Sequence, residues 1–292
     1  MDFLVIGGSG FLGQAVVRRA RQLGASVAAT FHLQPCSIGG VDWQRLDIRD
    51  HGNVAALIRR IRPGHVVNTA FKKNDWAATA GGAMHVALAA AADGVRMVHV
   101  SSDAVFSGRA HRYDETCMPD PVTPYGAAKA AAETAISGIH PAAVIARASL
   151  IVGDGDSPRE AQVRALATRT TTGVLFTDEV RCPVHVVDLA SALVELACSQ
   201  YSGIHHLAGA DAVNRHELGV LIARRDNLDE ASLPSGLRAD TDLSGALDVR
   251  LDCTMTQSRL TTRLRGVHEF LARDRSVSVG KGVDGSPRSV TH

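Results

Sequence analysis

Several features that mark membrane, secreted or nucleic-acid-binding proteins are missing from this sequence. Lys and Arg (31) balance Asp and Glu (30), for a net charge of +1, so nothing indicates the basic surface that nucleic acids require. Met1-Asp2 runs directly into apolar residues without the basic segment of a secretory signal. No apolar run approaches the roughly 20 residues that cross a bilayer. We therefore expect a cytoplasmic protein with no nucleic-acid partner and no membrane contact.

Cysteine and histidine lack the spacing of disulfide or metal sites. The five cysteines are odd in number and scattered, without a Cys-x-x-Cys pair. Of the 13 histidines, none pairs at a ligand spacing with a carboxylate. His205 and His206 are adjacent in a strand-like run, where their side chains face opposite ways. We expect free thiols in a reducing compartment and no metal site.

The first half of the chain alternates short β-branched apolar runs with Ala-rich helical stretches. This alternation is typical of βαβ units and predicts an α/β fold with a doubly wound parallel sheet of the Rossmann type. The length of 292 residues fits one such domain with a smaller appendage. Strands are expected at Phe3–Ile6, Ser26–Thr30, His65–Thr69, Arg96–Val100 and Ala143–Arg147, and helices at Phe11–Leu23, Val54–Ile61, Met84–Asp93 and Tyr125–Ser137.

The regular alternation of strands and helices stops in the second half, which begins with a Gly- and Asp-rich loop at Gly153–Pro158. Shorter elements follow, and a last helix is expected near Gln257–Ala272. We predict a sheet domain over 1–150 and a mainly substrate-binding region over 151–272, part of which returns to the sheet. Residues 273–292 are rich in Ser, Gly and charge, which predicts a disordered tail.

A glycine-rich loop follows the first strand and opens the first helix. Its glycines have the spacing G-x-x-G-x-x-G, which permits a sharp turn and a close backbone approach to a pyrophosphate at the helix N-terminus. A tight strand–helix turn without a ligand is the alternative interpretation. Because the loop occupies the first βα junction, it predicts a dinucleotide site. Its predicted cofactor contacts are Gly7, Gly10, Phe11, Leu12 and Gly13.

The end of the second strand bears on the choice between NAD and NADP. It reads Phe31-His32, with neither an acid for a ribose 2′-hydroxyl nor an arginine. The missing acid removes repulsion against a 2′-phosphate that His32 can contact, which favours NADP(H) over NAD(H). Asp47 is a candidate acceptor for the adenine amino group, or alternatively an acid at the start of the next helix. Ile48 and Ala70 are also predicted cofactor contacts.

A tyrosine and a lysine share one face of a predicted helix. Tyr125 and Lys129 are four residues apart, and Thr123-Pro124 before them is a typical helix start. An ammonium beside a phenol favours the phenolate and lowers its pKa toward the working range. Lys129 can also hold the nicotinamide ribose, so both residues belong to the predicted catalytic and cofactor sets.

Ser102 completes a predicted catalytic trio with Tyr125 and Lys129. Ser102 ends an apolar strand, at the sheet edge where open α/β folds bind ligands. A hydroxyl at this edge can polarise a substrate carbonyl while the tyrosine donates a proton. The order of glycine-rich loop, serine and Tyr/Lys pair predicts a carbonyl–alcohol oxidoreductase.

These motifs resemble the extended short-chain dehydrogenases, and among them the dTDP-4-dehydrorhamnose reductases. Ser101–Gly108 is similar to the S-T-D-Y-V-F-D-G segment of that family, and Ser102 matches its catalytic Thr. Pro63–Asn68 resembles its P-D-V-V-x-N strand, and Asp178–Pro183 with Val187–Ala190 resembles its C-terminal segment. The resemblance implies NAD(P)H-dependent reduction of a keto group on a nucleoside-diphosphate deoxysugar, with Tyr125 protonating the oxygen.

The chain departs from the family where the sugar is expected to bind. Ala104 replaces the Tyr of the family segment, and Leu150 stands where a Trp is expected, so the particular sugar is left open. Lys72, Lys73 and Arg181 are candidate ligands for a diphosphate, and the alternative is that the lysines are only solvated surface residues. Asp103 and Arg147 complete the predicted substrate contacts.

Two other functions and the oligomeric state remain open at this stage. The first is an epimerase or dehydratase of the same superfamily, which would regenerate its cofactor. The second is a non-catalytic regulatory subunit, as in the β subunit of methionine adenosyltransferase, although the complete trio argues against it. A homodimer is one possible assembly.

Overall fold

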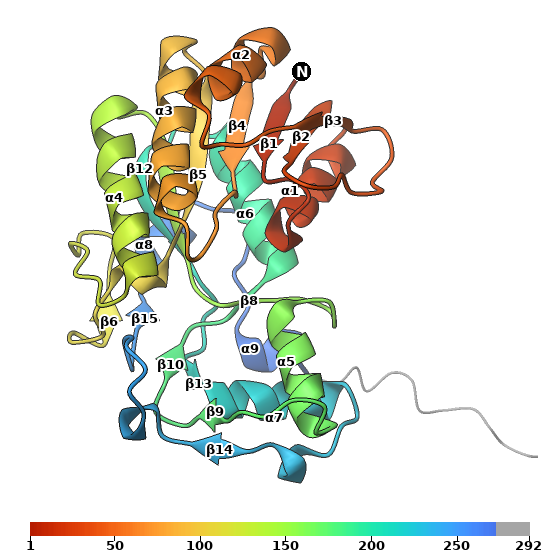
Figure 1. Cartoon of the computed structure of the whole chain (residues 1–292), viewed down its shortest axis with the longest axis vertical. Coiled ribbons are helices and arrows are strands. Elements are labelled where there is room, and N and C mark those ends of the chain that lie inside the picture. The colour runs from red at the N-terminus through yellow and green to blue at the C-terminus, as the bar shows by residue number, and fades with distance from the viewer. Residues whose placement is uncertain (273–292) are drawn as a thin grey trace, which may run out of the picture.

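The computed structural model describes residues 1–272, and a seven-stranded parallel sheet forms the centre of its larger part (Figure 1). The chain winds outward from β1 to β3 and then returns past β1 to β4. A topological switch point therefore lies between β1 and β4, at the edge where open sheets bind ligands. In spatial order the strands are β3 (Asp42–Arg45), β2 (Val27–Phe31), β1 (Phe3–Ile6), β4 (His65–Asn68), β5 (Arg96–Ser102), β7 (Val144–Ala148) and β12 (Gly203–Leu207).

Helices cover both faces of this sheet (Figure 1). One face carries α1 (Phe11–Gln22) and α6 (Val186–Cys198); the other carries α2 (His51–Ile61), α3 (Gly82–Ala92) and α4 (Pro124–Ile139). Because both faces are covered, the central strands are apolar along their length, and all four residues of β1 are buried. The predicted α/β fold with a doubly wound sheet is confirmed.

The expected elements of the first half lie within three residues of their observed bounds. Strand β3 was not predicted from the sequence. It reads Asp-Trp-Gln-Arg at the outer edge of the sheet, where its residues are half-buried or exposed. A strand in this position lacks the apolar pattern that reveals a buried strand.

The smaller part lies beneath the carboxyl edge of the sheet in Figure 1. Its helices α5 (Pro158–Ala167), α7 (Arg215–Arg225) and α9 (Val267–Phe270) share an apolar core that includes Val163 and Ile222. Between these segments in sequence, α6 and β12 return to the large sheet, where β12 pairs with β7. Short strand pairs are β8 (Ile151–Val152) with β11 (Val184–His185), β9 (Leu175–Phe176) with β14 (Ser235–Gly236), β10 (Val180–Arg181) with β13 (Val213–Asn214), and β6 (Arg112–Tyr113) with β15 (Arg250–Leu251).

The prediction of one helix over Gln257–Ala272 is wrong. Only α8 (Thr254–Gln257) and α9 are helical, with irregular chain between them. The backbone N–H groups of Thr261 and Thr262 donate to the carboxylate of Glu195 on α6 instead of to helical carbonyls. A side chain distant in sequence thus replaces the helical hydrogen bonds. The predicted disordered tail, 273–292, lies outside the described residues.

Candidate active site

The glycine-rich loop joins β1 to α1, and neither Gly7 nor Gly13 in it has space for a side chain. Gly7 has a φ of 81°, and a Cβ on Gly13 would lie 2.2 Å from the Gly7 carbonyl oxygen. Gly10 is exposed, and a Cβ there would meet only that same oxygen, at 3.3 Å. Gly10 caps α1 without a side-chain hydrogen bond. The open first turn of α1 therefore fits the pyrophosphate of a dinucleotide.

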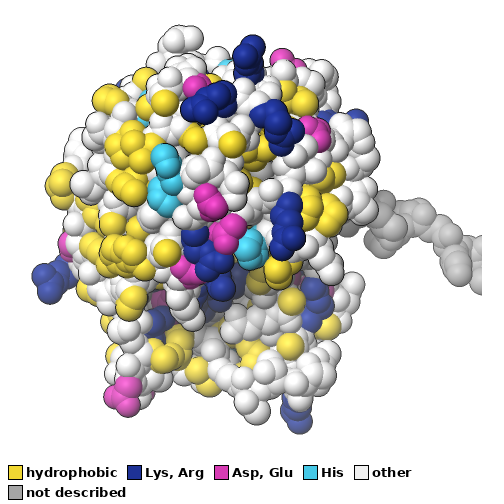
Figure 2. Space-filling view, turned by 45° about the horizontal axis from the view of Figure 1, so that its top comes forward, with side chains coloured by type: hydrophobic (Ala, Val, Ile, Leu, Met, Phe, Trp, Pro, Cys, Tyr) yellow, Lys and Arg dark blue, Asp and Glu magenta, His cyan; other side chains and the backbone are white. Residues whose placement is uncertain are grey.

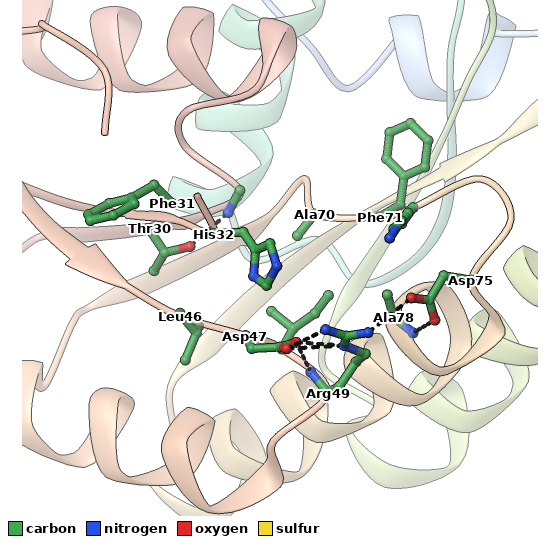
Figure 3. A pocket seen from close by; sticks show the side chains of 13 residues that line it. Thr30, Phe31, His32, Leu46, Asp47, Arg49, Ala70, Phe71, Asp75 and Ala78 are labelled. Carbon is green, nitrogen blue, oxygen red and sulfur yellow. Dashed lines mark hydrogen bonds and ion pairs between the residues drawn. The ribbon is translucent and has the colours of Figure 1, made fainter. Parts of the chain in front are cut away.

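A pocket of about 180 Å³ lies beside this loop, at the carboxyl ends of β2, β3 and β4 (Figure 3). Phe11 and Leu12, the two loop residues other than glycine that were predicted to contact the cofactor, do not line the pocket. Phe11 packs near Gly153, and Leu12 is buried in the core. The pocket is lined by five predicted cofactor residues, Gly7, His32, Asp47, Ile48 and Ala70, together with Thr30, Phe31, Leu46, Arg49, Phe71, Lys72, Asp75 and Ala78.

Asp47 is held by an arginine that the sequence analysis did not identify. The Arg49 guanidinium donates to the Asp47 carboxylate at 2.6 Å and to Asp75 at 3.3 Å, as Figure 3 shows. Hydrogen bonds from Arg49 lower the pKa of Asp47 to about 2. Asp50, not Asp47, caps α2 by accepting a hydrogen bond from Asn53. The helix-start interpretation of Asp47 is therefore wrong, and its ionised carboxylate faces the pocket.

Helix α4 begins as predicted and brings Tyr125 to the sheet edge. The Thr123 hydroxyl accepts a hydrogen bond from the N–H of Gly126 at 3.0 Å, and Pro124 is the first helical residue. A Cβ on Gly126 would lie 2.1 Å from the carbonyl oxygen of Ala104. This glycine therefore lets α4 pack directly against the turn that follows Ser102.

Ser102, Tyr125 and Lys129 meet at the carboxyl edge of the sheet. Ser102 is the last residue of β5, and its hydroxyl oxygen accepts from the N–H of Ala104 at 3.2 Å. A hydrogen bond between Ser102 and Tyr125 acts to lower the pKa of the phenol. The ammonium of Lys129 donates to the Val100 carbonyl at 2.9 Å. Strand β5 thus positions Ser102, and helix α4 positions both Tyr125 and Lys129.

The expected effect of Lys129 on the pKa of Tyr125 is wrong for this state of the protein. Burial raises the pKa of Tyr125 to about 12, against the smaller opposing effect of Ser102. Burial also lowers the pKa of Lys129 to about 8. Because the ammonium is directed to Val100, it does not activate the phenol, which therefore remains protonated at neutral pH.

Phe71 connects the pocket with the catalytic pair. Its ring lies 5.7 Å from that of Tyr125, and the Lys129 ammonium lies 5.1 Å from the ring centroid. Phe71 also lines the pocket beside the glycine-rich loop and is 54% exposed. One side chain therefore borders both the pocket and the trio, which places them along one continuous edge of the sheet.

Arg147 is wrong as a predicted substrate contact. Its side chain is 0% exposed and forms an ion pair with Glu133 at 2.8 Å inside the protein. Its guanidinium also donates to the Cys117 carbonyl and lies over the Phe106 ring. Lys72 lines the pocket beside the glycine-rich loop. Its contact with the substrate stays a prediction.

Asp103 and Arg181 do lie close together, yet both are largely occupied by protein groups. Asp103 accepts a hydrogen bond from Ser149 at 2.7 Å and lies 3.6 Å from Nε of Arg181. The Arg181 guanidinium also donates to the carbonyls of Val180, Leu247 and Ala246. Arg181 is thus held in place by the chain and has little capacity for a ligand.

The described part of the chain, residues 1–272, contains no group of three or more His, Cys, Asp or Glu side chains placed to hold a metal ion. None of its helices combines the length and apolar character needed to span a membrane.

The sequence matches proteins of known families along nearly all of the described chain. The family model described as "RmlD substrate binding domain" matches residues 1–272. A probable low-salt glycan biosynthesis reductase of Haloferax volcanii is 30% identical over 262 residues, 84% of this chain and 87% of that protein. A dTDP-4-keto-6-deoxy-D-glucose reductase of Streptomyces niveus is 30% identical over 235 residues, 76% of this chain and 77% of that protein. Methionine adenosyltransferase 2 β subunits of Xenopus and rodents match at 24% to 26% identity.

Solved structures share the fold. The dTDP-4-dehydrorhamnose reductase of Bacillus anthracis, solved in complex with NADP, has a TM-score of 0.76 and 21% identity. The match covers 92% of this chain and 96% of that one. The fold, the glycine-rich loop and the family model therefore agree. This chain belongs to the RmlD substrate binding domain family.

Proposed function

We propose that this protein is an NAD(P)H-dependent reductase that converts a keto group on a nucleoside-diphosphate deoxysugar to an alcohol. The single observation that carries the proposal is the meeting of Ser102, Tyr125 and Lys129 at the carboxyl edge of the sheet, beside the glycine-rich loop. Family membership and the two reductases that are 30% identical support the substrate class.

The trio suits the reductive direction of this chemistry. A bound nicotinamide supplies the hydride that reaches the carbonyl carbon. The Ser102 hydroxyl polarises the carbonyl oxygen, and Tyr125 donates its proton to that oxygen as negative charge develops. Because the pKa of Tyr125 is raised to about 12, the phenol carries its proton throughout the physiological pH range. We assign Lys129, whose ammonium donates to the Val100 carbonyl, to holding the nicotinamide ribose when the cofactor is bound.

We further propose that NADPH is preferred over NADH. The pocket beside the loop has exposed His32 at the end of β2, where NAD-specific sites place an acid. Asp47 and Asp75 are already bound to Arg49, which reduces their repulsion of a 2′-phosphate. The substitution His32→Asp is therefore expected to reverse the ratio of kcat/KM for NADPH and NADH. An unchanged ratio would remove His32 from the account of cofactor choice.

Net cofactor consumption tests the proposed reaction. Purified protein is mixed with NADPH and a nucleoside-diphosphate 4-keto-6-deoxysugar, and absorbance at 340 nm is followed together with the sugar product by mass spectrometry. Stoichiometric NADPH oxidation and a product two mass units heavier are expected. Conversion of a sugar nucleotide without net NADPH loss would instead indicate an epimerase or dehydratase.

The relatives among methionine adenosyltransferase β subunits give a second, non-catalytic candidate. The complete trio favours the enzyme, since a regulatory subunit has no need of a proton donor next to a polarising hydroxyl. Cofactor binding without turnover of any keto-sugar, combined with a stable complex with a methionine adenosyltransferase, would favour the regulatory function.

A further inference from the structure

A fully buried histidine lies in the strand that ends at Ser102. His99 is 0% exposed and belongs to β5. Ser101 on the same strand donates its hydroxyl hydrogen to Glu133 of α4. Because side chains alternate between the two faces of a strand, the ring of His99 lies on the same face as Ser101, which α4 covers. Figure 2 shows a shaded hollow where the larger and smaller parts meet, and the burial of His99 keeps its ring away from that hollow.

Lys129 of the trio reaches the same buried layer from α4. It precedes Glu133 by one helical turn and is 2% exposed. Its ammonium donates at 2.9 Å to the carbonyl of Val100, the residue directly after His99. Burial and, after it, the positive charge of Lys129 lower the pKa of His99, as a cation does to a neighbouring imidazole. His99 is therefore a neutral ring next to the Lys129 ammonium.

The hydrogen bonds of Asn68 determine which ring nitrogen of His99 carries the hydrogen. Oδ1 of Asn68 accepts from the N–H of Ala70 at 3.1 Å, which fixes the orientation of the side-chain amide. Nδ2 of Asn68 therefore donates to Nδ1 of His99, at 3.2 Å. A neutral imidazole that accepts at Nδ1 carries its hydrogen at Nε2. Within residues 1–272, no group accepts a hydrogen bond from this buried Nε2.

The Lys129 ammonium is also short of acceptors. A lysine ammonium has three N–H donors, and the described chain gives this one a single hydrogen bond, to Val100. The ammonium also lies 5.1 Å from the centre of the Phe71 ring, which supplies no lone pair. Buried donors are normally satisfied by protein groups or by ordered water. Two neighbouring buried donors need an acceptor with two lone pairs, which a water oxygen provides.

We propose that His99 is a positioning residue for Lys129, and that its Nε2–H holds a buried water molecule that accepts a hydrogen bond from the lysine ammonium. The assignment rests on the proposed function of Lys129 in holding the nicotinamide ribose. The water and the Val100 carbonyl hold the ammonium from the protein side, and the ribose binds to its remaining N–H. Asn68 extends this line of hydrogen bonds to the backbone of Ala70, which lines the cofactor pocket. His99 thus links the pocket wall to the lysine that holds the cofactor.

The water stabilises the charged form of Lys129 against the effect of burial, which lowers the pKa of this lysine to about 8. Besides neutral His99 on β5, Glu133 and Tyr125 on α4 are the ionisable neighbours of Lys129. Glu133 acts to raise the pKa of Lys129 and is itself paired with Arg147, while Tyr125, with a pKa of about 12, stays neutral. The affinity for NADPH should therefore fall as the pH rises above about 8 and Lys129 loses its proton. Lys129→Met should abolish this inflection.

The dissociation constant of NADPH for the full chain, measured by fluorescence from about pH 7 to pH 10, tests the assignment without any sugar substrate. His99→Asn keeps an oxygen for Asn68 near the position of Nδ1 but removes the donor at Nε2. It should lower the inflection by about 0.5 pH unit and weaken binding above the inflection about threefold, because the ammonium loses a stabilising partner. His99→Gln, whose side-chain N–H reaches the position of Nε2, should keep the inflection of the wild type.

His205→Asn is the matched control. His205 is also 0% exposed, and its Nε2 has no hydrogen-bond partner among the described residues. It lies on β12, however, and β7 separates that strand from β5. This variant should lower the melting temperature, because a buried ring is lost, without moving the inflection.

A His99→Asn variant that melts earlier yet keeps or raises the inflection of the wild type would overturn the proposal. A lowered inflection in His99→Gln would overturn it too, and this variant decides the question if His99→Asn does not fold. The proposal also fails if the wild type shows no inflection or if Lys129→Met retains it. An inflection that moves as expected in a protein that converts no keto-sugar would instead retain the function of His99 and refute the proposed reaction.

Discussion

Replacement of Arg147 by leucine should destabilise the protein without affecting substrate binding directly. Three bonds of 2.8 to 3.2 Å join the Arg147 guanidinium to the Glu133 carboxylate, and the two side chains are 0% and 4% exposed. Removal of one partner from a buried ion pair costs about 3–5 kcal/mol, because the other charge stays buried alone. At roughly 2–4 °C per kcal/mol for a domain of this size, Arg147→Leu should lower Tm by roughly 6–20 °C.

Thermal unfolding followed by circular dichroism, together with steady-state kinetics below the melting transition, measures this effect. The double variant Arg147→Leu/Glu133→Leu should recover much of the loss, since no unpaired charge remains. Arg112→Leu is the control, because its ion pair with Asp252 is exposed, and Tm should not change. A large increase in KM for Arg147→Leu at unchanged Tm would refute the reasoning and return Arg147 to the substrate site.

Two other substitutions test the cofactor loop and the buried lysine. Gly13→Ala should abolish cofactor binding measured by fluorescence, because its Cβ would lie 2.2 Å from the Gly7 carbonyl oxygen. Gly138→Ala on α4 is the control: its Cβ would meet no atom within 4 Å, so cofactor binding should be unchanged. Burial lowers the pKa of Lys129 from 10.5 to about 8, so between these pH values the unfolded chain holds a proton that the folded chain has lost. The free energy of unfolding of the wild type, relative to that of Lys129→Met, should therefore rise by about 3 kcal/mol from pH 8 to pH 10.5 when measured by urea unfolding. A difference between the two proteins that stays constant with pH would contradict this.

Local signals were sufficient for the central strands of the sheet, the glycine-rich loop and the placement of the trio. The four residues of β1 are buried on both faces and therefore read as a continuous apolar run. The start of α4 depends on Thr123 and Pro124, which are neighbours in sequence. Such features require no knowledge of distant partners, so sequence reasoning located Tyr125 and Lys129 on one helix correctly.

Residues whose role depends on a distant partner were missed or misassigned. A charged residue in an apolar strand suggests a ligand, but Arg147 is paired with Glu133, which lies on α4 and not on the neighbouring strand. The effect of Lys129 on Tyr125 depended on where the ammonium points, and it points to Val100.

The most direct test of the central claim is the rate at which Tyr125→Phe oxidises NADPH with a nucleoside-diphosphate 4-keto-6-deoxysugar. The variant keeps the ring that contacts Phe71 and lacks only the hydroxyl. If Tyr125 donates the proton, kcat should fall about 10²–10⁴-fold while the dissociation constant for NADPH and Tm stay close to those of the wild type. Undiminished turnover by Tyr125→Phe would contradict the assignment of Tyr125 as the proton donor.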